Sequence, residues 1–300
     1  MNRGYVYVLL CYLLIGMSYP IAKDAMTQIP IWLFTCITFA IAFTLLMPFV
    51  HFGDKLALHR IGLRAWLAIC TQALLGAVLY TVFLLYGFAS ATAIVASVFS
   101  SLAPAAVLTL ASLVLKERLS TRKVLAILLA IAGVLVLTLP ASDDSGHTTL
   151  AGVVSLLLST LSTAGAVVAA KKIDVDLPPA TLAAGVCLAG TLFTLPMAVD
   201  QGLSFDWPQL GLSNGLVMLY YGALVWAVPY LLYFKGVPRI PASATGMAIA
   251  VIPIAASFFS ILFYGERMHL SDALALILVI LSIIAAEARE TRKAVQASPA

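Results

Sequence analysis

The sequence has little charge. Asp, Glu, Lys and Arg make up 10% of its 300 residues, whereas hydrophobic residues make up 62%. Soluble domains carry about 25% charged residues, so this chain has too few polar side chains to cover a particle in water. We therefore expect a protein whose solvent is largely lipid. A nucleic-acid partner is not expected, because no basic face exists outside the short loops.

Cysteine is also scarce. The cysteines fall inside apolar runs, and their spacing is not that of metal ligands. We expect these side chains to pack as small apolar groups, with no metal site and no cofactor. The four residues are Cys11, Cys36, Cys70 and Cys187.

The middles of the apolar runs contain no Asp, Glu, Lys, Arg or His. Intramembrane carboxylates are the usual proton relays and cation sites, so we do not expect a bare ion held by charges at mid-membrane. Either proton coupling uses residues near the ends, such as Asp24, Glu117 or Glu266, or the protein is a facilitator. Serines are abundant, but no base accompanies them, which argues against an intramembrane enzyme.

The chain contains many long apolar runs. A membrane-crossing helix needs about 20 mostly apolar residues, and these runs predict an all-α polytopic protein with ten transmembrane helices. The first run is longer than a signal-peptide core and is interpreted as a retained helix. The runs are 4–22, 31–50, 65–87, 91–115, 124–139, 150–170, 180–199, 212–234, 241–264 and 270–286.

The positive charges predict the orientation of these spans. With the N-terminus in the cytoplasm, all but two of the 17 Lys and Arg residues lie on the cytoplasmic side; the exceptions are Lys23 and Arg267. We therefore predict that both termini are cytoplasmic.

An internal repeat relates the two halves of the chain at a spacing of 149 residues. An odd number of helices in each half inverts the second half in the membrane, and inverted repeats are typical of alternating-access transporters. We predict two inverted five-helix repeats, 1–140 and 150–288, and a cytoplasmic tail, 289–300. The matched pairs include Pro104 with Pro253, Glu117 with Glu266 and Arg118 with Arg267.

The ends of the two repeats resemble the drug/metabolite transporter superfamily, and more narrowly its ten-helix EamA-type exporters. The similar segments are 115–120 (LKERLS), followed by Gly133 and Val134, and its echo 264–267 (YGER). The start of the first helix is also similar, at Gly16, Ser18, Pro20 and Lys23.

This chain departs from the resemblance at Thr38 and Phe39, where members often have Arg-Phe. No role of an arginine in the second helix is therefore carried over. The resemblance implies export of an amino acid, a related amphipathic compound or an opine-type metallophore across a bacterial inner membrane.

Polar and aromatic groups at membrane depth are the candidate substrate-binding residues. A Tyr hydroxyl or a Trp N–H in hydrocarbon needs a partner, so these groups are expected to turn inward and line a cavity. Hydrogen bonds between packed helices are the alternative. The candidates are Tyr12, Tyr19, Gln72, Tyr80, Ser97, Ser101, Ser159, Trp226, Tyr230 and Ser257.

Pro104 and Pro253 each follow a stripe of small or polar residues, and two interpretations stay open. The prolines are hinges beside a central site, or the stripes serve close helix packing. For Asp24 and the pairs Glu117–Arg118 and Glu266–Arg267, structural ion pairs are favoured over coupling, because charges at helix ends snorkel to the interface.

We predict an exporter that works by alternating access on a small-molecule substrate within the lipid bilayer. An importer or facilitator of the same fold, and a structural membrane protein that transports nothing, remain alternatives. Small residues at Ala126, Ala130 and Gly133 permit a homodimer without requiring one.

Overall fold

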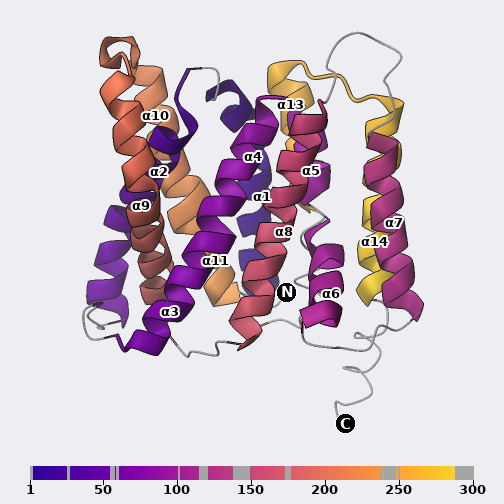
Figure 1. Ribbon diagram of the computed structural model, residues 1–300, viewed down its shortest axis with the longest axis horizontal. Helices are drawn as coiled ribbons and strands as arrows, with labels where there is room; N and C mark the ends of the chain where they lie inside the picture. Colours follow the sequence, from indigo (N-terminus) through magenta and orange to yellow (C-terminus); the bar gives the residue numbers. More distant parts are fainter. Residues whose placement is uncertain are drawn as a thin grey trace.

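The computed structural model describes residues 3–25, 28–54, 58, 61–100, 102–114, 121–137, 149–172, 177–236, 239, 248 and 251–287. Over these residues the chain forms helices and no strand, so the prediction of an all-α protein is confirmed for this part of the chain. The helices stand side by side as a bundle (Figure 1).

Within its described residues, the first half contains seven α-helices and two π-helical segments. They are α1 (Arg3–Ala25), α2 (Ile31–Pro48), η1 (Phe49–Asp54), α3 (Leu63–Thr71), η3 (Gln72–Leu79), α4 (Tyr80–Phe88), α5 (Ala93–Ser100), α6 (Ala103–Val114) and α7 (Thr121–Leu137).

The described elements of the second half repeat this order. They are α8 (Leu150–Lys172), α9 (Pro179–Ser204), the 3-10 turn η4 (Trp207–Gln209), α10 (Leu212–Tyr220), η5 (Tyr221–Ala227), α11 (Val228–Gly236), α13 (Val251–Tyr264) and α14 (Leu270–Glu287).

In the part of the chain that the structure describes, six helices are long and apolar enough to cross a membrane. Val251–Tyr264 and Ala93–Val107 are shorter apolar segments, so the count of ten spans stays a prediction. The six are Arg3–Ala25, Ile31–Asp54, Leu63–Phe88, Leu150–Ala169, Pro179–Ser204 and Leu212–Gly236.

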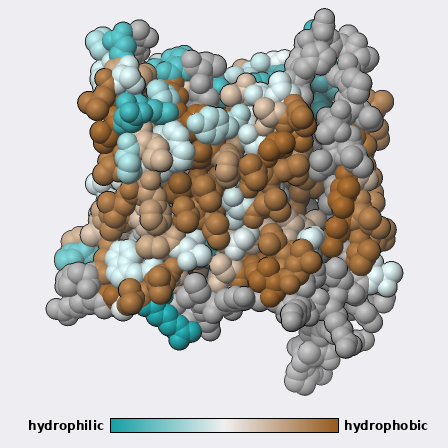
Figure 2. Space-filling model, viewed as in Figure 1, coloured by the Kyte–Doolittle hydropathy of each residue, from teal (hydrophilic) through white to brown (hydrophobic). Residues whose placement is uncertain are grey.

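The outer surface is suited to lipid. Large apolar side chains such as Leu128, Leu192 and Phe258 are each more than half exposed. Figure 2 shows hydrophobic residues across the middle of one face and hydrophilic residues gathered toward its upper and lower ends. A soluble protein does not expose apolar surface on this scale, whereas a hydrocarbon environment makes it favourable.

Equivalent elements of the two halves begin 147–149 residues apart. α3 begins at Leu63 and α10 at Leu212; η3 begins at Gln72 and η5 at Tyr221. Both intervals are 149 residues, the spacing found in the sequence. The repeat therefore extends to the π-helical segments, whose wider turns interrupt the two long helices at the same place.

Two equivalent helices, α2 and α9, are antiparallel and cap each other. Asp54, at the end of η1, accepts hydrogen bonds from the backbone N and Oγ1 of Thr181 at 2.7 and 2.8 Å, near the start of α9. At the other end of the pair, Oε1 of Gln201 accepts hydrogen bonds from the backbone N–H groups of Trp32 and Leu33 at the start of α2. These acceptors satisfy backbone donors that a helix start leaves without partners.

The first helices of the two halves, α1 and α8, also run in opposite directions. Thr149, just before α8, donates its N–H to the Ser90 carbonyl at 3.1 Å, beside the start of α5. Lys23 in the last turn of α1 binds Glu266, which also accepts the Ala93 N–H at the start of α5. The start of α8 and the end of α1 therefore lie at the same end of the bundle.

We call this the Lys23 end. The opposite end holds the start of α1 and the end of α11, because Gly236 packs against the Gly4 carbonyl and Val8. We call it the Lys235 end. In Figure 1 α10 lies at the Lys23 end and its equivalent α3 at the Lys235 end, so this pair is inverted as well.

The sequence suggested one helix over 91–115 with a central proline, and here the structure differs. α5 ends at Ser100 and α6 begins at Ala103, which places Pro104 in the first turn of α6. Proline lacks an N–H, and the first turn of a helix is where that donor would have no helical partner. Pro253 also lies within α13. A hinge role for both prolines stays a prediction.

A first prediction concerns the contact between α1 and α13 at Gly16. A Cβ there would lie 2.7 Å from both the Ile252 carbonyl oxygen and the Ala255 Cβ, so Gly16→Ala forces the two helices apart. We expect it to destabilise the fold by about 1–3 kcal/mol, measured as a lower thermal unfolding midpoint. In Gly215→Ala the new Cβ meets open space, and the midpoint should stay or rise. Equal midpoints for both variants would contradict this packing.

Candidate functional site

A cavity of about 650 Å³ lies between the two halves. Equivalent elements from each half form its wall: α1 and α8, η3 and η5, α4 and α11. This volume is within the range of small-molecule sites, roughly 300–1,000 Å³. Neither half encloses the cavity alone, so the site depends on the packing of one repeat against the other.

The described lining of the cavity carries no Asp, Glu, Lys, Arg or His. Its polar groups are hydroxyls, one amide and one indole N–H. They belong to Tyr12, Ser18, Tyr19, Thr71, Gln72, Tyr80, Thr81, Ser100, Thr160, Thr163, Tyr221, Trp226, Tyr230 and Tyr233. The remaining lining side chains are apolar, apart from the Cys11 thiol, so the site can bind by ring packing and neutral hydrogen bonds.

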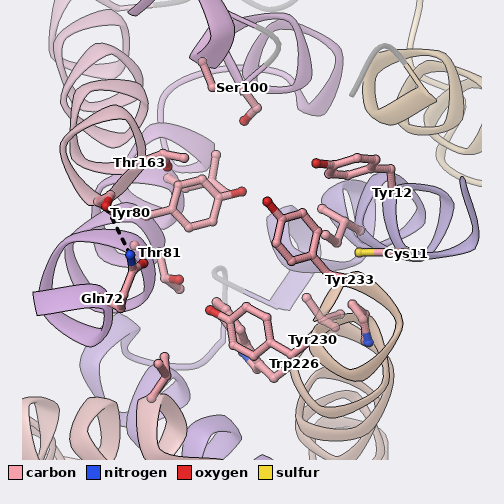
Figure 3. A pocket seen from close by; sticks show the side chains of 18 of the residues that line it. Cys11, Tyr12, Gln72, Tyr80, Thr81, Ser100, Thr163, Trp226, Tyr230 and Tyr233 are labelled. Atoms are coloured by element: carbon pink, nitrogen blue, oxygen red, sulfur yellow. Dashed lines mark hydrogen bonds between the residues drawn. The ribbon is translucent and has the colours of Figure 1, made fainter. Parts of the chain in front are cut away.

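Aromatic rings dominate the centre of the cavity. In Figure 3 the hydroxyls of Tyr12, Tyr80 and Tyr233 point toward one common space. The rings of Tyr12 and Tyr233 meet edge to face, with centroids 6.4 Å apart. Trp226 lies beside Tyr230 at 5.7 Å and packs on Phe39 at 4.6 Å, which holds the indole in place.

At the Lys23 end a buried tyrosine network closes the cavity. Tyr19 is 1% exposed, donates its hydroxyl to Ser100 Oγ at 2.5 Å, and lies 3.4 Å from the Tyr80 hydroxyl. Its ring meets Phe88 edge to face at 5.3 Å. Tyr19 thereby ties α1 to α4 and α5 above the central space.

An ion pair lies beyond this network, at the same end. Lys23 Nζ is 2.6 Å from Glu266 Oε1, which also accepts the Ala93 N–H at 3.3 Å. Glu266 is 12% exposed on its side chain, so water screens this pair only partly. The contact joins α1 and α5 of the first half to the turn between α13 and α14 of the second.

Near the Lys235 end the lining is more accessible. Ala169, Leu177 and Phe234 are half-buried, whereas Tyr19, Ala22 and Phe88 at the other end are buried. The cavity is therefore closed at the Lys23 end and more open toward the Lys235 end.

Two equivalent hydrogen bonds cross between the halves at the π-helical segments. Gln72, the first residue of η3, donates from Nε2 to the Ala166 carbonyl of α8 at 3.1 Å. Tyr221, the first residue of η5, donates its hydroxyl to the Ser18 carbonyl of α1. Each π-helical segment is thus fastened to the first helix of the opposite half.

Six of the ten predicted binding residues line the cavity: Tyr12, Tyr19, Gln72, Tyr80, Trp226 and Tyr230. The structure does not bring three of the four predicted serines to it. Ser97 donates to the Ile94 carbonyl and Ser159 to the Tyr80 carbonyl, while Ser257 is buried outside the lining. Ser101 lies outside the described residues.

Several lining residues were not among the candidates. Tyr233 follows Trp226 by seven residues and Tyr230 by three, so the three share one helical face and this spacing indicated that Tyr233 also lines the cavity. Tyr221 stands 149 residues after Gln72, so the repeat itself pointed to it. Cys11 and Thr81 gave no signal, because a small side chain in an apolar helix usually only packs.

For the charged candidates, the structure pairs Glu266 with Lys23, while Arg267 is exposed. Asp24 is exposed next to Lys23, and Glu117 and Arg118 lie outside the described residues. No group of three or more metal-ligand side chains gathers within the described residues.

Known proteins share this sequence pattern and fold. The model of the EamA-like transporter family matches residues 2–139 and again 150–286. The uncharacterized transporter YetK of Bacillus subtilis is 25% identical over 86% of this chain and 78% of its own length. An uncharacterized transporter of Archaeoglobus fulgidus is 27% identical over 82% of this chain and 84% of its own. One crystal structure, 18% identical, superposes over 98% of this chain and 99% of its own with a TM-score of 0.68.

A second prediction tests which end of the cavity is open. In a background with the four native cysteines replaced by alanine, we compare Ala169→Cys near the Lys235 end with Ala22→Cys near the Lys23 end. A bulky, water-soluble maleimide should label Ala169→Cys at least about tenfold faster in purified protein, because Ala22 is buried and local opening of closed structure is rare. Equal rates, or faster labelling at position 22, would show that the open end is misassigned.

Proposed function

Because this chain belongs to the EamA-like transporter family, we propose that it is a secondary transporter that exports a small amphipathic organic molecule by alternating access. The observation that carries the proposal is the cavity between the two repeats, lined equivalently by both and closed at one end. Sites at the interface of inverted repeats are the usual substrate sites of such transporters.

The proposed architecture is ten spans in two inverted five-helix repeats. It is supported by the antiparallel packing of α2 with α9 and of α1 with α8, and by the offset of 147–149 residues between the starts of equivalent elements. α7 and α14, which begin 149 residues apart, supply the fifth helix of each repeat.

The proposed location is a bacterial inner membrane with both termini in the cytoplasm. Among the described residues, Arg3, Arg64 and Lys235 lie at the Lys235 end, and the distribution of Lys and Arg along the sequence makes this end cytoplasmic. The cavity then opens toward the cytoplasm, as an exporter requires when it loads its cargo. Because the repeats are equivalent, the packing that closes the Lys23 end has a counterpart that closes the other.

The lining supports an organic cargo over an inorganic ion. An ion in a site without charged groups loses its hydration without a replacement partner, whereas rings and hydroxyls suit a molecule with apolar and polar parts. The binding roles of Tyr12, Tyr80, Trp226 and Tyr230 belong to this proposal.

A third prediction tests cargo binding and direction together. A counterflow screen of proteoliposomes against amino acids, nucleobases, polyamines and chelators identifies a cargo, and everted vesicles should then accumulate it. Tyr12→Phe removes one hydroxyl from the cavity and should lower the transport efficiency about fivefold, the value of one neutral hydrogen bond.

Tyr5→Phe is the matched control, because Tyr5 lies on the same helix but is exposed and outside the lining. The proposal fails if no compound exchanges in counterflow. If Tyr12→Phe and Tyr5→Phe both transport at the wild-type rate, the cargo does not use the hydroxyl of Tyr12.

A fourth prediction concerns the ion pair at the Lys23 end. Glu266→Gln removes the charge that holds Lys23 and should populate the state open at this end, since about 1 kcal/mol changes a population about fivefold. The labelling of Ala22→Cys should rise by that factor. Asp200→Asn removes an exposed acidic charge at the same end and should leave the rate unchanged. A rise of equal size in both variants would mean that net charge, and not this pair, sets the rate.

A further inference from the structure

Two buried donors in the cavity wall have no acceptor within the described residues. They are Nε1 of Trp226 and Oγ1 of Thr81, and each side chain is 6% exposed. A buried donor without a partner is unfavourable, and native structures rarely keep one without a reason. Both residues line the cavity, one from each repeat. The question is therefore which molecule supplies the acceptor.

Trp226 is held in an orientation that keeps its donor unpaired. Its ring packs between Phe39 and Tyr230, at centroid distances of 4.6 and 5.7 Å. An indole N–H only donates, so it selects for an acceptor such as a carbonyl oxygen. It also gains nothing from a cationic group, which has no acceptor to offer.

Thr81 differs from the other threonines on the helices around it. Thr35, Thr71 and Thr160 each donate their hydroxyl to the carbonyl four residues earlier. This local bond is the ordinary solution for threonine in an apolar helix. Thr81 does not make this bond, so its hydroxyl is buried in the cavity wall without a partner.

The rest of the wall restricts the charge and shape of that molecule. None of the described lining residues is ionisable as a carboxylate, amine, guanidinium or imidazole, so a net charge on the ligand would be buried without a counter-charge. The tyrosine rings around the central space favour a flat ring, which packs on them edge to face or offset.

On this basis we propose that the cavity takes an uncharged molecule with an aromatic ring and a carbonyl-type acceptor, which Trp226 Nε1 and Thr81 Oγ1 bind. The inference rests on the proposed transport function, whose cargo class it names. The ring lies among Tyr12, Tyr80, Tyr230 and Tyr233, and the acceptor faces the two unpaired donors.

The test uses four probes that share one indole ring: N-acetyltryptophanamide, which is neutral and has two carbonyls; tryptamine, a cation; indole-3-acetate, an anion; and indole, which has no acceptor. Binding to the full-length protein in nanodiscs is measured by isothermal titration calorimetry. N-acetyltryptophanamide should bind at least about tenfold more tightly than each of the others.

Two substitutions then locate the donor. Trp226→Phe keeps a ring on Phe39 and removes the N–H, and it should weaken N-acetyltryptophanamide about tenfold while leaving indole within about twofold. Thr81→Val keeps the shape of the side chain and should weaken the same probe by several-fold. Trp207→Phe is the control, because the Trp207 N–H binds the Gly202 carbonyl far from the lining.

The ligand class is wrong if a charged probe binds as tightly as N-acetyltryptophanamide, if Trp226→Phe binds it like the wild type, or if none of the four binds below about 1 mM. Counterflow separates this failure from that of the transporter. Exchange of a charged compound would overturn the ligand class and leave the transporter proposal standing, whereas the absence of exchange for every compound would overturn both.

Discussion

The two halves of this protein meet through helices that run in opposite directions, and the remaining architecture follows from that contact. In hydrocarbon a helix start has no water to satisfy its free N–H groups. Here α2 receives its acceptor from Gln201 and α9 from Asp54, so each helix caps its counterpart. These hydrogen bonds fix the direction and the axial position of one half against the other.

Once the halves are fixed in this way, equivalent elements face each other across a shared space. Gly87 packs on Leu156, and the equivalent Gly236 packs on Val8. These close contacts bring α4 against α8 and α11 against α1, around the cavity. A wall made from two copies of one unit therefore surrounds a site that neither copy contains alone.

Much of the fold was predictable from apolar run lengths and from the repeat. The run 65–87 corresponds to α3, η3 and α4 over 63–88, because the apolar run itself sets the length of the span. The π-helical segments were not predictable, since no residue pattern marks them. They occur where packing is tight, as at Gly222, whose missing Cβ leaves room for Ile41. The break in the helix before Pro104 was not predicted, because proline is tolerated within membrane helices.

The sequence predicted those lining residues whose polar groups force the side chain to turn inward. A Trp or Tyr at membrane depth needs a polar partner, and Tyr12, Trp226 and Tyr230 do line the cavity. The rule fails for serine, because a serine hydroxyl can satisfy itself on its own helix, as Ser97 does with Ile94. Sequence alone therefore finds aromatic residues that line the cavity, whereas Ser97, Ser159 and Ser257 lie outside its lining; the binding role of these residues stays a prediction.

The neutrality of the described lining has a consequence for energetics. A membrane potential does work on charge, about 2.3 kcal/mol per elementary charge for each 100 mV. The lining residues carry none, so a switch of the cavity from one side to the other moves no fixed charge of its own through the field. Voltage acts only on charge that the cargo brings or on groups at the ends, such as Lys23 and Glu266. For a neutral cargo, the current that accompanies transport thus reports on charged groups at the ends or on a co-transported ion.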